Sequence, residues 1–196
     1  MSCNFSSVVI DKLCKEAVEG NAGVACFYFD FANPEQSPAA ILGSVLKQVV
    51  RGLDEVPERI VRAFRDRGKA IGGQMLTLSQ IAQFLQDISS SRSTFICIDA
   101  LDECPPGHRI KLLDSLNQIL RNSPGARIFM TGRPHILGEV EKNLRGRIET
   151  RSITPTKHDI VTFLRAKLRE DTMPDAMNES LEQEIIRNIP EKISEM

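Results

Sequence analysis

The chain has 196 residues, with 25 lysines and arginines against 26 aspartates and glutamates. This balance excludes a general electrostatic attraction to nucleic acid or to an anionic membrane. The five cysteines show no metal-ligand spacing, and there is neither an apolar run of about 18 residues nor a signal peptide, so the composition predicts a soluble protein of the reducing cytoplasm.

Apolar periodicity predicts alternating helices and strands along the chain. Helices are expected at residues 5–19, 38–52, 55–68, 78–88, 110–120, 136–144, 156–169 and 181–189. Continuous apolar runs predict buried strands at 24–31, 94–98 and 126–131, and a weaker strand is expected at Ile148–Ile153. Strands separated by helices predict a mostly parallel sheet in a three-layer α/β fold.

Polar residues and prolines mark several helix ends. Helix starts are predicted at the N-cap Ser37–Pro38 and at the capping boxes Thr77–Gln80 and Thr156–Asp159. Pro190 is expected to end the last helix, because proline lacks the backbone N–H that a helix interior uses.

The segment Thr94–Cys104 is an apolar strand that runs directly into an acidic cluster. Carboxylates just past such a strand lie at the carboxyl edge of the sheet, where open α/β folds bind their ligands. Asp99 suits a hydrated Mg²⁺, and Asp102 and Glu103 suit the orientation or deprotonation of an attacking water. The alternative is a strand that ends in a polar turn, with Asp99 and Asp102 capping backbone amides.

Thr94–Cys104 resembles the Walker B segment of the NACHT family of signalling NTPases, which shows an apolar run, Asp, a small residue, Leu and then Asp-Glu; Ala100 is the small residue. Phe27–Phe31 with Ile41–Gln48, and Ile128–Pro134, resemble the nephrocystin-3-like subgroup of these STAND-type proteins, which is abundant in filamentous fungi. The joint order of these segments carries the resemblance, which covers nearly the whole chain.

The resemblance implies a partial P-loop NTPase core at residues 1–154 and the beginning of a helical lid at 155–196. It implies that intact relatives bind Mg²⁺ with ATP or GTP and switch a signalling assembly. In such relatives an arginine at the position of Arg133 reads the terminal phosphate, a task that suits a planar guanidinium. It also implies Mg²⁺ at Asp99 through water, and catalytic roles for Asp102 and Glu103.

The phosphate-binding loop G-x-x-x-x-G-K-[ST] does not occur in this sequence. The one Gly-Lys pair, Gly68-Lys69, follows a helical segment and is preceded by Ala63 where the first glycine belongs. Compared with the family, the first strand and its loop are missing before the helix at 5–19, and the chain is expected to be a fragment that binds or hydrolyses nucleotide poorly and holds no cofactor by itself. The strand at 126–131, which precedes the sensor-like Arg133, is then expected to border an open groove or to pair directly with Ile148–Ile153.

Two other readings remain open. One is a degenerate α/β scaffold that binds protein partners or associates with itself and has no nucleotide chemistry. The other is a different α/β enzyme that uses Asp99 and Asp102 as an acid/base pair. The basic residues around Arg59–Lys69 alternate with acidic ones, which favours a solvated helix face, and neither nucleic acid nor a membrane is an expected partner.

Overall fold

The structure, a computed structural model, describes residues 2–30, 36–69, 75–146, 148–170 and 179–194. It divides into two compact units, residues 1–148 and 149–196. The described elements are α1 (Ser2–Gly20), β1 (Gly23–Tyr28), α2 (Pro38–Arg51), α3 (Glu58–Lys69), α4 (Leu78–Ser91), β2 (Thr94–Asp99), η1 (Leu101–Glu103), α5 (Pro106–Asn122), β3 (Ala126–Met130), η2 (Pro134–Ile136), α6 (Leu137–Asn143), α7 (Lys157–Arg169) and α8 (Glu179–Ser194).

The first unit is built on a parallel three-stranded sheet with the strand order β1-β2-β3. Ala25 pairs with Ile96, and Ile96 pairs with Ile128, so the three apolar runs lie in register. The predicted α/β fold with a parallel sheet is thereby confirmed. The last predicted residue of the first strand, Phe31, lies outside the described residues.

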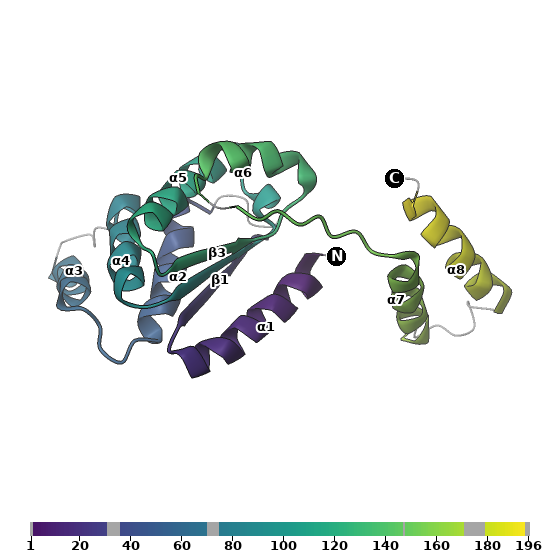
Figure 1. Cartoon of the computed structure of the whole chain (residues 1–196), viewed down its shortest axis with the longest axis horizontal. Helices are drawn as coiled ribbons and strands as arrows, with labels where there is room; N and C mark the ends of the chain where they lie inside the picture. The colour runs from purple at the N-terminus through teal and green to yellow at the C-terminus, as the bar shows by residue number, and fades with distance from the viewer. Residues whose placement is uncertain (1, 31–35, 70–74, 147, 171–178, 195–196) are drawn as a thin grey trace. The chain divides into compact units, whose positions relative to one another are not determined.

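The two faces of the sheet are covered differently (Figure 1). One face, which includes Ile96 and Ile98, packs against α2, α4 and α5 in a continuous apolar core. The other face packs against α1, which contacts β1 and β2. The largest side chains that the core buries completely are Ile41, Leu42, Leu46, Ile60, Leu85, Ile96, Ile98, Leu101, Leu112, Leu113, Leu116 and Ile119.

The predicted helix starts are confirmed. The Ser37 hydroxyl accepts a hydrogen bond from the Ala40 N–H before the N-terminal proline of α2. Both predicted capping boxes form at α4 and α7, where the cap hydroxyl and the side chain three residues later satisfy each other's backbone N–H groups.

Two predictions at the end of the chain are wrong. Ile148–Ile153 forms no strand: Ile148 is 41% and Ile153 is 60% exposed, because two isolated isoleucines among polar residues bury too little apolar surface to offset the entropy of ordering the backbone. Pro190 does not end the last helix, since α8 continues to Ser194 with the proline ring buried inside it. Its missing N–H removes one helical hydrogen bond, and its buried ring contributes apolar packing that offsets part of that loss.

Arg92, at the end of α4, joins three segments at the amino ends of the strands. Its guanidinium donates to the carbonyl oxygens of Asn21 at 2.7 Å and of Ala22 at 3.1 Å, and also to that of Gly52. The end of α1, the start of β1 and the end of α2 are therefore held by one side chain.

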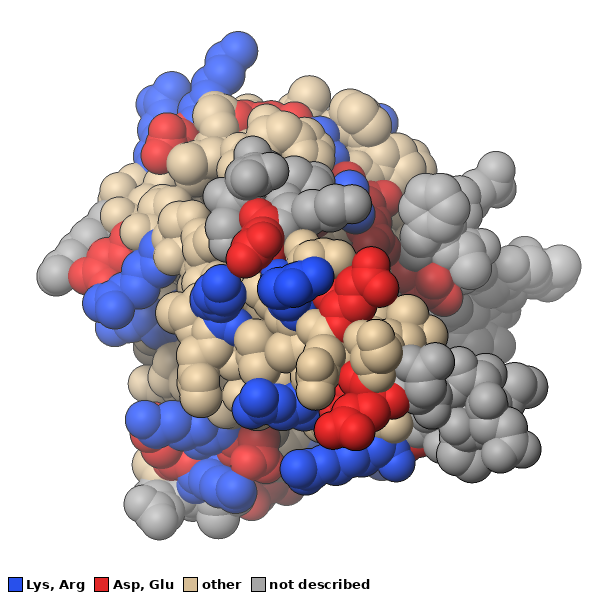
Figure 2. All heavy atoms as spheres, turned by 90° about the vertical axis from the view of Figure 1, so that its right-hand side faces the viewer, with Lys and Arg blue, Asp and Glu red and all other residues tan. Residues whose placement is uncertain are grey.

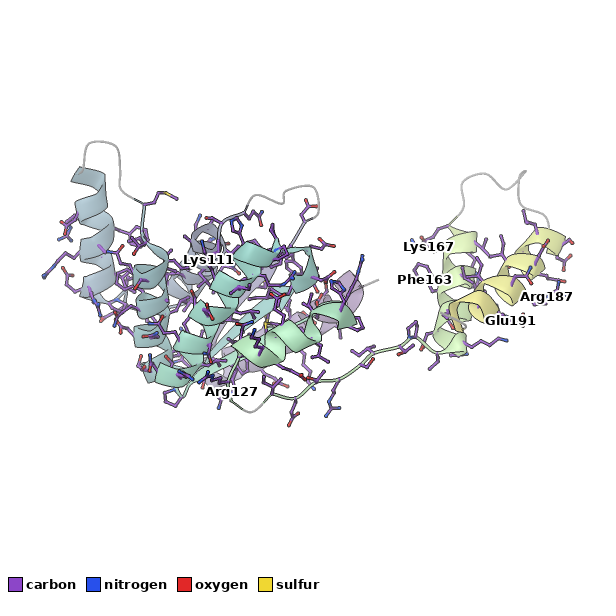
Figure 3. All side chains as sticks on the ribbon, turned by 90° about the horizontal axis from the view of Figure 1, so that it is seen from above. Lys111, Arg127, Phe163, Lys167, Arg187 and Glu191 are labelled. Carbon is purple, nitrogen blue, oxygen red and sulfur yellow. The ribbon has the colours of Figure 1, made fainter. Side chains whose placement is uncertain are left out.

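The second unit is a pair of helices, α7 and α8, that pack on each other. Ile160 is buried, whereas Phe163 is 42% exposed and points away from α8 (Figure 3). Among the described residues, no helix combines the length and the hydropathy that crossing a bilayer requires.

Candidate functional site

The carboxyl ends of β2 and β3 bring together most of the side chains that the sequence singled out. Asp99 is the last residue of β2, and Thr131 follows directly after β3. Because the strands are parallel and in register, both lie at one edge of the sheet. Asp102, in the turn after β2, and Arg133, two residues after Thr131, lie at the same edge, since they form an ion pair.

Asp99 is a buried carboxylate, 2% exposed, that is held by a neighbouring hydroxyl. The Thr131 Oγ1 hydroxyl donates to Asp99 Oδ1 at 2.5 Å and accepts the Ala100 N–H at 3.0 Å. The pKa of Tyr28, which pairs with Asp99 across the sheet, is raised mainly by burial, with smaller contributions from Cys26 and Asp99. The Asp99 carboxylate and the Thr131 hydroxyl therefore place oxygen ligands next to each other at this edge.

Ala100 turns the chain away from the strand. Its backbone is left-handed, with φ 55° and ψ 46°, a conformation that costs a residue with a Cβ about 1–2 kcal/mol. Two hydrogen bonds to Thr131 maintain this conformation. The Ala100 N–H donates to the Thr131 hydroxyl, and the Leu101 N–H donates to the Thr131 carbonyl at 2.9 Å. This reversal leads directly into η1, which carries Asp102 and Glu103.

Asp102 fixes the segment that follows β3. Its carboxylate accepts the Arg133 backbone N–H at 3.2 Å and lies 3.3 Å from Arg133 Nε. The Asp102 side chain is 9% exposed and that of Arg133 is 76% exposed, so the guanidinium lies at the surface. Gly132 permits this approach: a Cβ there would lie 2.8 Å from Ile136 Cδ1 and 3.5 Å from Asp102 Oδ1.

Glu103 differs from the two aspartates. It is half-buried, and within the described part of the chain its carboxylate has no hydrogen-bond or ion-pair partner. Its backbone N–H donates to the Ala100 carbonyl at 2.9 Å, which closes the turn. Of the three predicted acidic site residues, Glu103 alone has an uncommitted carboxylate.

Arg109 and Glu139 complete the site and were not identified from the sequence. Arg109 is buried on α5 and donates to the carbonyl oxygens of Asp102 at 3.3 Å and of Cys104 at 2.8 Å. It also makes two 2.9 Å hydrogen bonds to the Glu139 carboxylate, which raise the pKa of Arg109 and lower that of Glu139. The turn that carries Asp102 and Glu103 is thus supported by Arg109, which the bidentate ion pair with Glu139 holds in place.

A signal for Arg109 was present in the sequence. It lies three and four residues before Leu112 and Leu113, so helical spacing places it on the apolar face of α5. An arginine at a core position requires a buried partner. The partner, Glu139, lies on a different helix, and no local pattern connects the two.

The donor set at the carboxyl edge fits the metal half of a nucleotide site. Carboxylate and hydroxyl oxygens are ligands that Mg²⁺ prefers, together with water and phosphate oxygens. Within the described residues no three His, Cys, Asp or Glu side chains gather into a metal-binding group, so a cation here would need water or ligand oxygens as well. The phosphate half does not fit, because the sequence has no glycine-rich loop with its lysine.

Two other features of the surface are a hollow and the distribution of charge. A hollow of about 320 Å³ at the amino ends of the strands includes Cys14, Val24 and Arg92 in its lining and none of the predicted site residues. On the face seen in Figure 2, basic and acidic side chains are interspersed rather than gathered by sign. The described residues visible on this face therefore form no extended basic patch for a polyanion.

In a comparison with protein families, the model for the N-terminal region of nephrocystin 3 matches residues 4–133. That stretch is more than half of the chain and contains Asp99, Asp102, Glu103, Arg109 and Arg133. Comparisons with curated proteins and with solved structures found no significant match.

Proposed function

The chain belongs to the nephrocystin 3 N-terminal family, and on that premise we propose that it is a regulatory module of the NACHT-like kind, whose carboxyl-edge site responds to a magnesium-bound nucleoside triphosphate. In this proposal Asp99 binds the hydrated Mg²⁺, and Arg133 contacts the terminal phosphate. Asp102 and Glu103 face the water next to that phosphate. Nucleotide binding by this chain alone is weak, and hydrolysis is negligible.

The observation that carries the proposal is the pairing of Asp99 with Thr131 next to the pairing of Asp102 with Arg133. Both lie where parallel α/β sheets bind ligands. Thr131 orients one oxygen of the buried Asp99 carboxylate, which pre-organises it for a cation. Mg²⁺ at this position supplies positive charge beside the phosphates.

Arg133 supports the phosphate role through its exposure. A guanidinium that is 76% exposed is only loosely held by a single carboxylate, because solvent screens such pairs. Phosphate oxygens compete for the same planar N–H groups. Release of the Arg133 guanidinium from Asp102 would leave only the Arg133 backbone N–H bonded to that carboxylate, and this gives a bound phosphate a route to loosen the segment after β3.

The missing phosphate loop supports weak binding. Backbone N–H groups and a lysine normally supply most of the stabilisation of the β and γ phosphates. Calorimetric titration with Mg·ATP and with Mg·GTP should therefore give dissociation constants of about 1 mM or weaker. Tight, magnesium-dependent binding would contradict this part of the proposal.

A second measurement locates the site. Mn²⁺ replaces Mg²⁺ and broadens NMR signals near it, so Mn·ATP should broaden the amides of Ala100 and Thr131. Asp99→Asn keeps an oxygen that accepts the Thr131 hydrogen bond but removes the charge, and it should abolish the broadening. Asp54→Asn is the matched control, because Asp54 is exposed and follows Gly52, near the opposite end of the strands. Broadening that survives in Asp99→Asn would refute the assignment of Asp99.

A second function is favoured by a different observation. β3 forms an edge of the sheet, with no further strand beside it among the described residues. Edge strands offer unpaired backbone groups to another chain. A protein-interaction scaffold without nucleotide chemistry is therefore the competing proposal, and it predicts normal association in the Asp99→Asn variant.

A further inference from the structure

The outer edge of β3 presents backbone groups that the fold leaves unused. The Gly125 carbonyl and the Thr131 N–H bond to the segment of β2, and bonding residues alternate in a parallel ladder. Arg127 and Phe129 therefore direct their backbone groups toward β2. Ile128 and Met130, between them, direct their N–H and C=O groups outward, where no described strand pairs with them.

The edge lacks the devices that usually block strand pairing. β3 contains no proline, and the side chains on its core face are Ala126, Ile128 and Met130. On the opposite face α1 packs on β1 and β2, and the Phe129 ring next to them is half-buried. Natural edge strands are normally protected by prolines, inward-pointing charges or a covering element.

Arg127 is the one charged residue of the strand, and its guanidinium lies beside this edge because it contacts the Ala126 carbonyl. Its guanidinium folds back on the chain and donates to the carbonyl oxygens of Pro124 at 2.6 Å and of Ala126 at 2.9 Å. Within β3 the guanidinium bonds only to the carbonyl of the first residue, Ala126. The uncommitted part of the edge therefore begins at Ile128.

We propose that the β3 edge binds the β3 edge of a second copy of this chain, antiparallel, across a two-fold axis that is normal to the sheet and passes midway between the two Ile128 residues. Ile128 then faces its counterpart as a hydrogen-bonded pair, each donating its N–H to the other's carbonyl. The outward Met130 N–H meets the carbonyl of the partner's Ala126, whose second lone pair accepts it beside the bond from the partner's Arg127. Three strands from each copy form one continuous sheet.

The side chains of β3 complement themselves in this register. Arg127 lies opposite the partner's Phe129, so like charges are not opposed across the new strand pair. The small Ala126 lies opposite the long Met130. The two-fold axis keeps each sheet face continuous, which brings the apolar side chains of both core faces together. A strand that matches itself in hydrogen bonding, charge and size favours a second copy over an unrelated partner.

This inference develops the interaction function and does not rest on nucleotide binding. Its test is therefore run without nucleotide or divalent cation. If Mg·ATP fails to bind while the dimer forms, the switch proposal fails and this one stands. A monomer that binds nucleotide gives the reverse result.

Sedimentation velocity across about 1–100 µM provides the first test, a range in which weak protein complexes become populated. The full chain should shift from monomer to dimer within it. Ile128→Pro should weaken the dimer at least tenfold, because it removes the central outward N–H while leaving the ladder to β2 intact. Ile128→Thr is the matched control: it keeps the N–H and a β-branched side chain, and it should still dimerise.

A cross-linking experiment tests the register and does not depend on the proline variant folding. Chains carrying Arg127→Cys and chains carrying Phe129→Cys are oxidised separately and as a mixture. The mixture should form a disulfide-linked dimer, and each variant alone should not exceed the wild-type background from native cysteines. A wild-type chain that stays monomeric, a proline variant that dimerises normally, or equal cross-linking in all samples would overturn the proposal.

Discussion

The two faces of the sheet differ in how completely they are buried. On the face toward α2, α4 and α5, Ile96 and Ile98 are fully buried in a continuous core. On the face toward α1, Val24 and Phe95 are only half-buried, and Val8 of α1 is 68% exposed. The difference indicates that the packed face holds the fold together, while the α1 face is a thinner cover that tolerates change.

The largest expected effect comes from a cavity on the packed face. Ile98→Ala should lower the free energy of unfolding by about 2–5 kcal/mol, because the site is completely enclosed and cannot collapse. Val24→Ala, on the α1 face of the neighbouring strand, should cost less than about 1.5 kcal/mol, since that side chain is smaller and only partly buried. Urea denaturation of both variants measures the two values. Equal losses would show that α1 protects its face as well as the core helices protect theirs.

An intermediate effect is expected at the junction between α4 and β3, where Gly125 passes close to backbone. A Cβ at Gly125 would collide with the Ser89 carbonyl oxygen and lie 3.0 Å from that of Arg92. Gly125→Ala should therefore cost about 1–3 kcal/mol, because backbone must move. Gly107→Ala, where nothing lies within 4 Å of the new Cβ, should be neutral or slightly stabilising in the same thermal or urea measurement. A tolerated Gly125→Ala would show that this junction is loosely packed.

The smallest effect concerns the ion pair that joins α5 to α6. Arg109 lowers the pKa of Glu139 in the folded state, so its stabilisation is fully present above the ordinary glutamate pKa of about 4.3 and is lost as the pH falls through the lowered folded value. The free energy of unfolding of the wild type should exceed that of Glu139→Gln by about 1 kcal/mol at pH 7, and the difference should approach zero near pH 3. The measurement is the urea midpoint of each protein against pH.

Titration of the second unit does not affect the difference between the two proteins. The pKa of Asp159 is lowered by its hydrogen bonds with Thr156 at the start of α7, and this group titrates equally in both proteins. Parallel pH curves for wild type and Glu139→Gln would mean that Arg109 is held equally well by the neutral amide. Arg109 would then act on the acidic turn through its carbonyl contacts alone.

Sequence patterns predicted the framework of the packed face well, because each pattern is local. A continuous apolar run predicted β2, and hydroxyl residues three positions before a partner predicted both capping boxes. The carboxyl-edge position of Asp99 and Asp102 followed from the parallel order of the strands. Their partners, Thr131 and Arg133, come from the next strand along the sheet.

Features that depend on distant partners were missed. The bond between Arg109 and Glu139 joins residues thirty positions apart, and neither side chain signals the other locally. Residues 148–153 alternate like a strand, yet no described strand pairs with them there. Pro190 was expected to break α8, because the value of burying its ring depends on packing that the helix sequence alone does not reveal.

The Arg92 guanidinium has a consequence for local opening of the molecule. Since one side chain binds three carbonyl groups, fraying at the end of α1 frees the acceptors just before β1 and just after α2 at the same moment. Amide hydrogens near Asn21 and Gly52 should therefore exchange with deuterium as a single cooperative unit. Lysine cannot replace Arg92 here, because its compact ammonium group lacks the planar, widely spaced N–H donors that reach three separate acceptors.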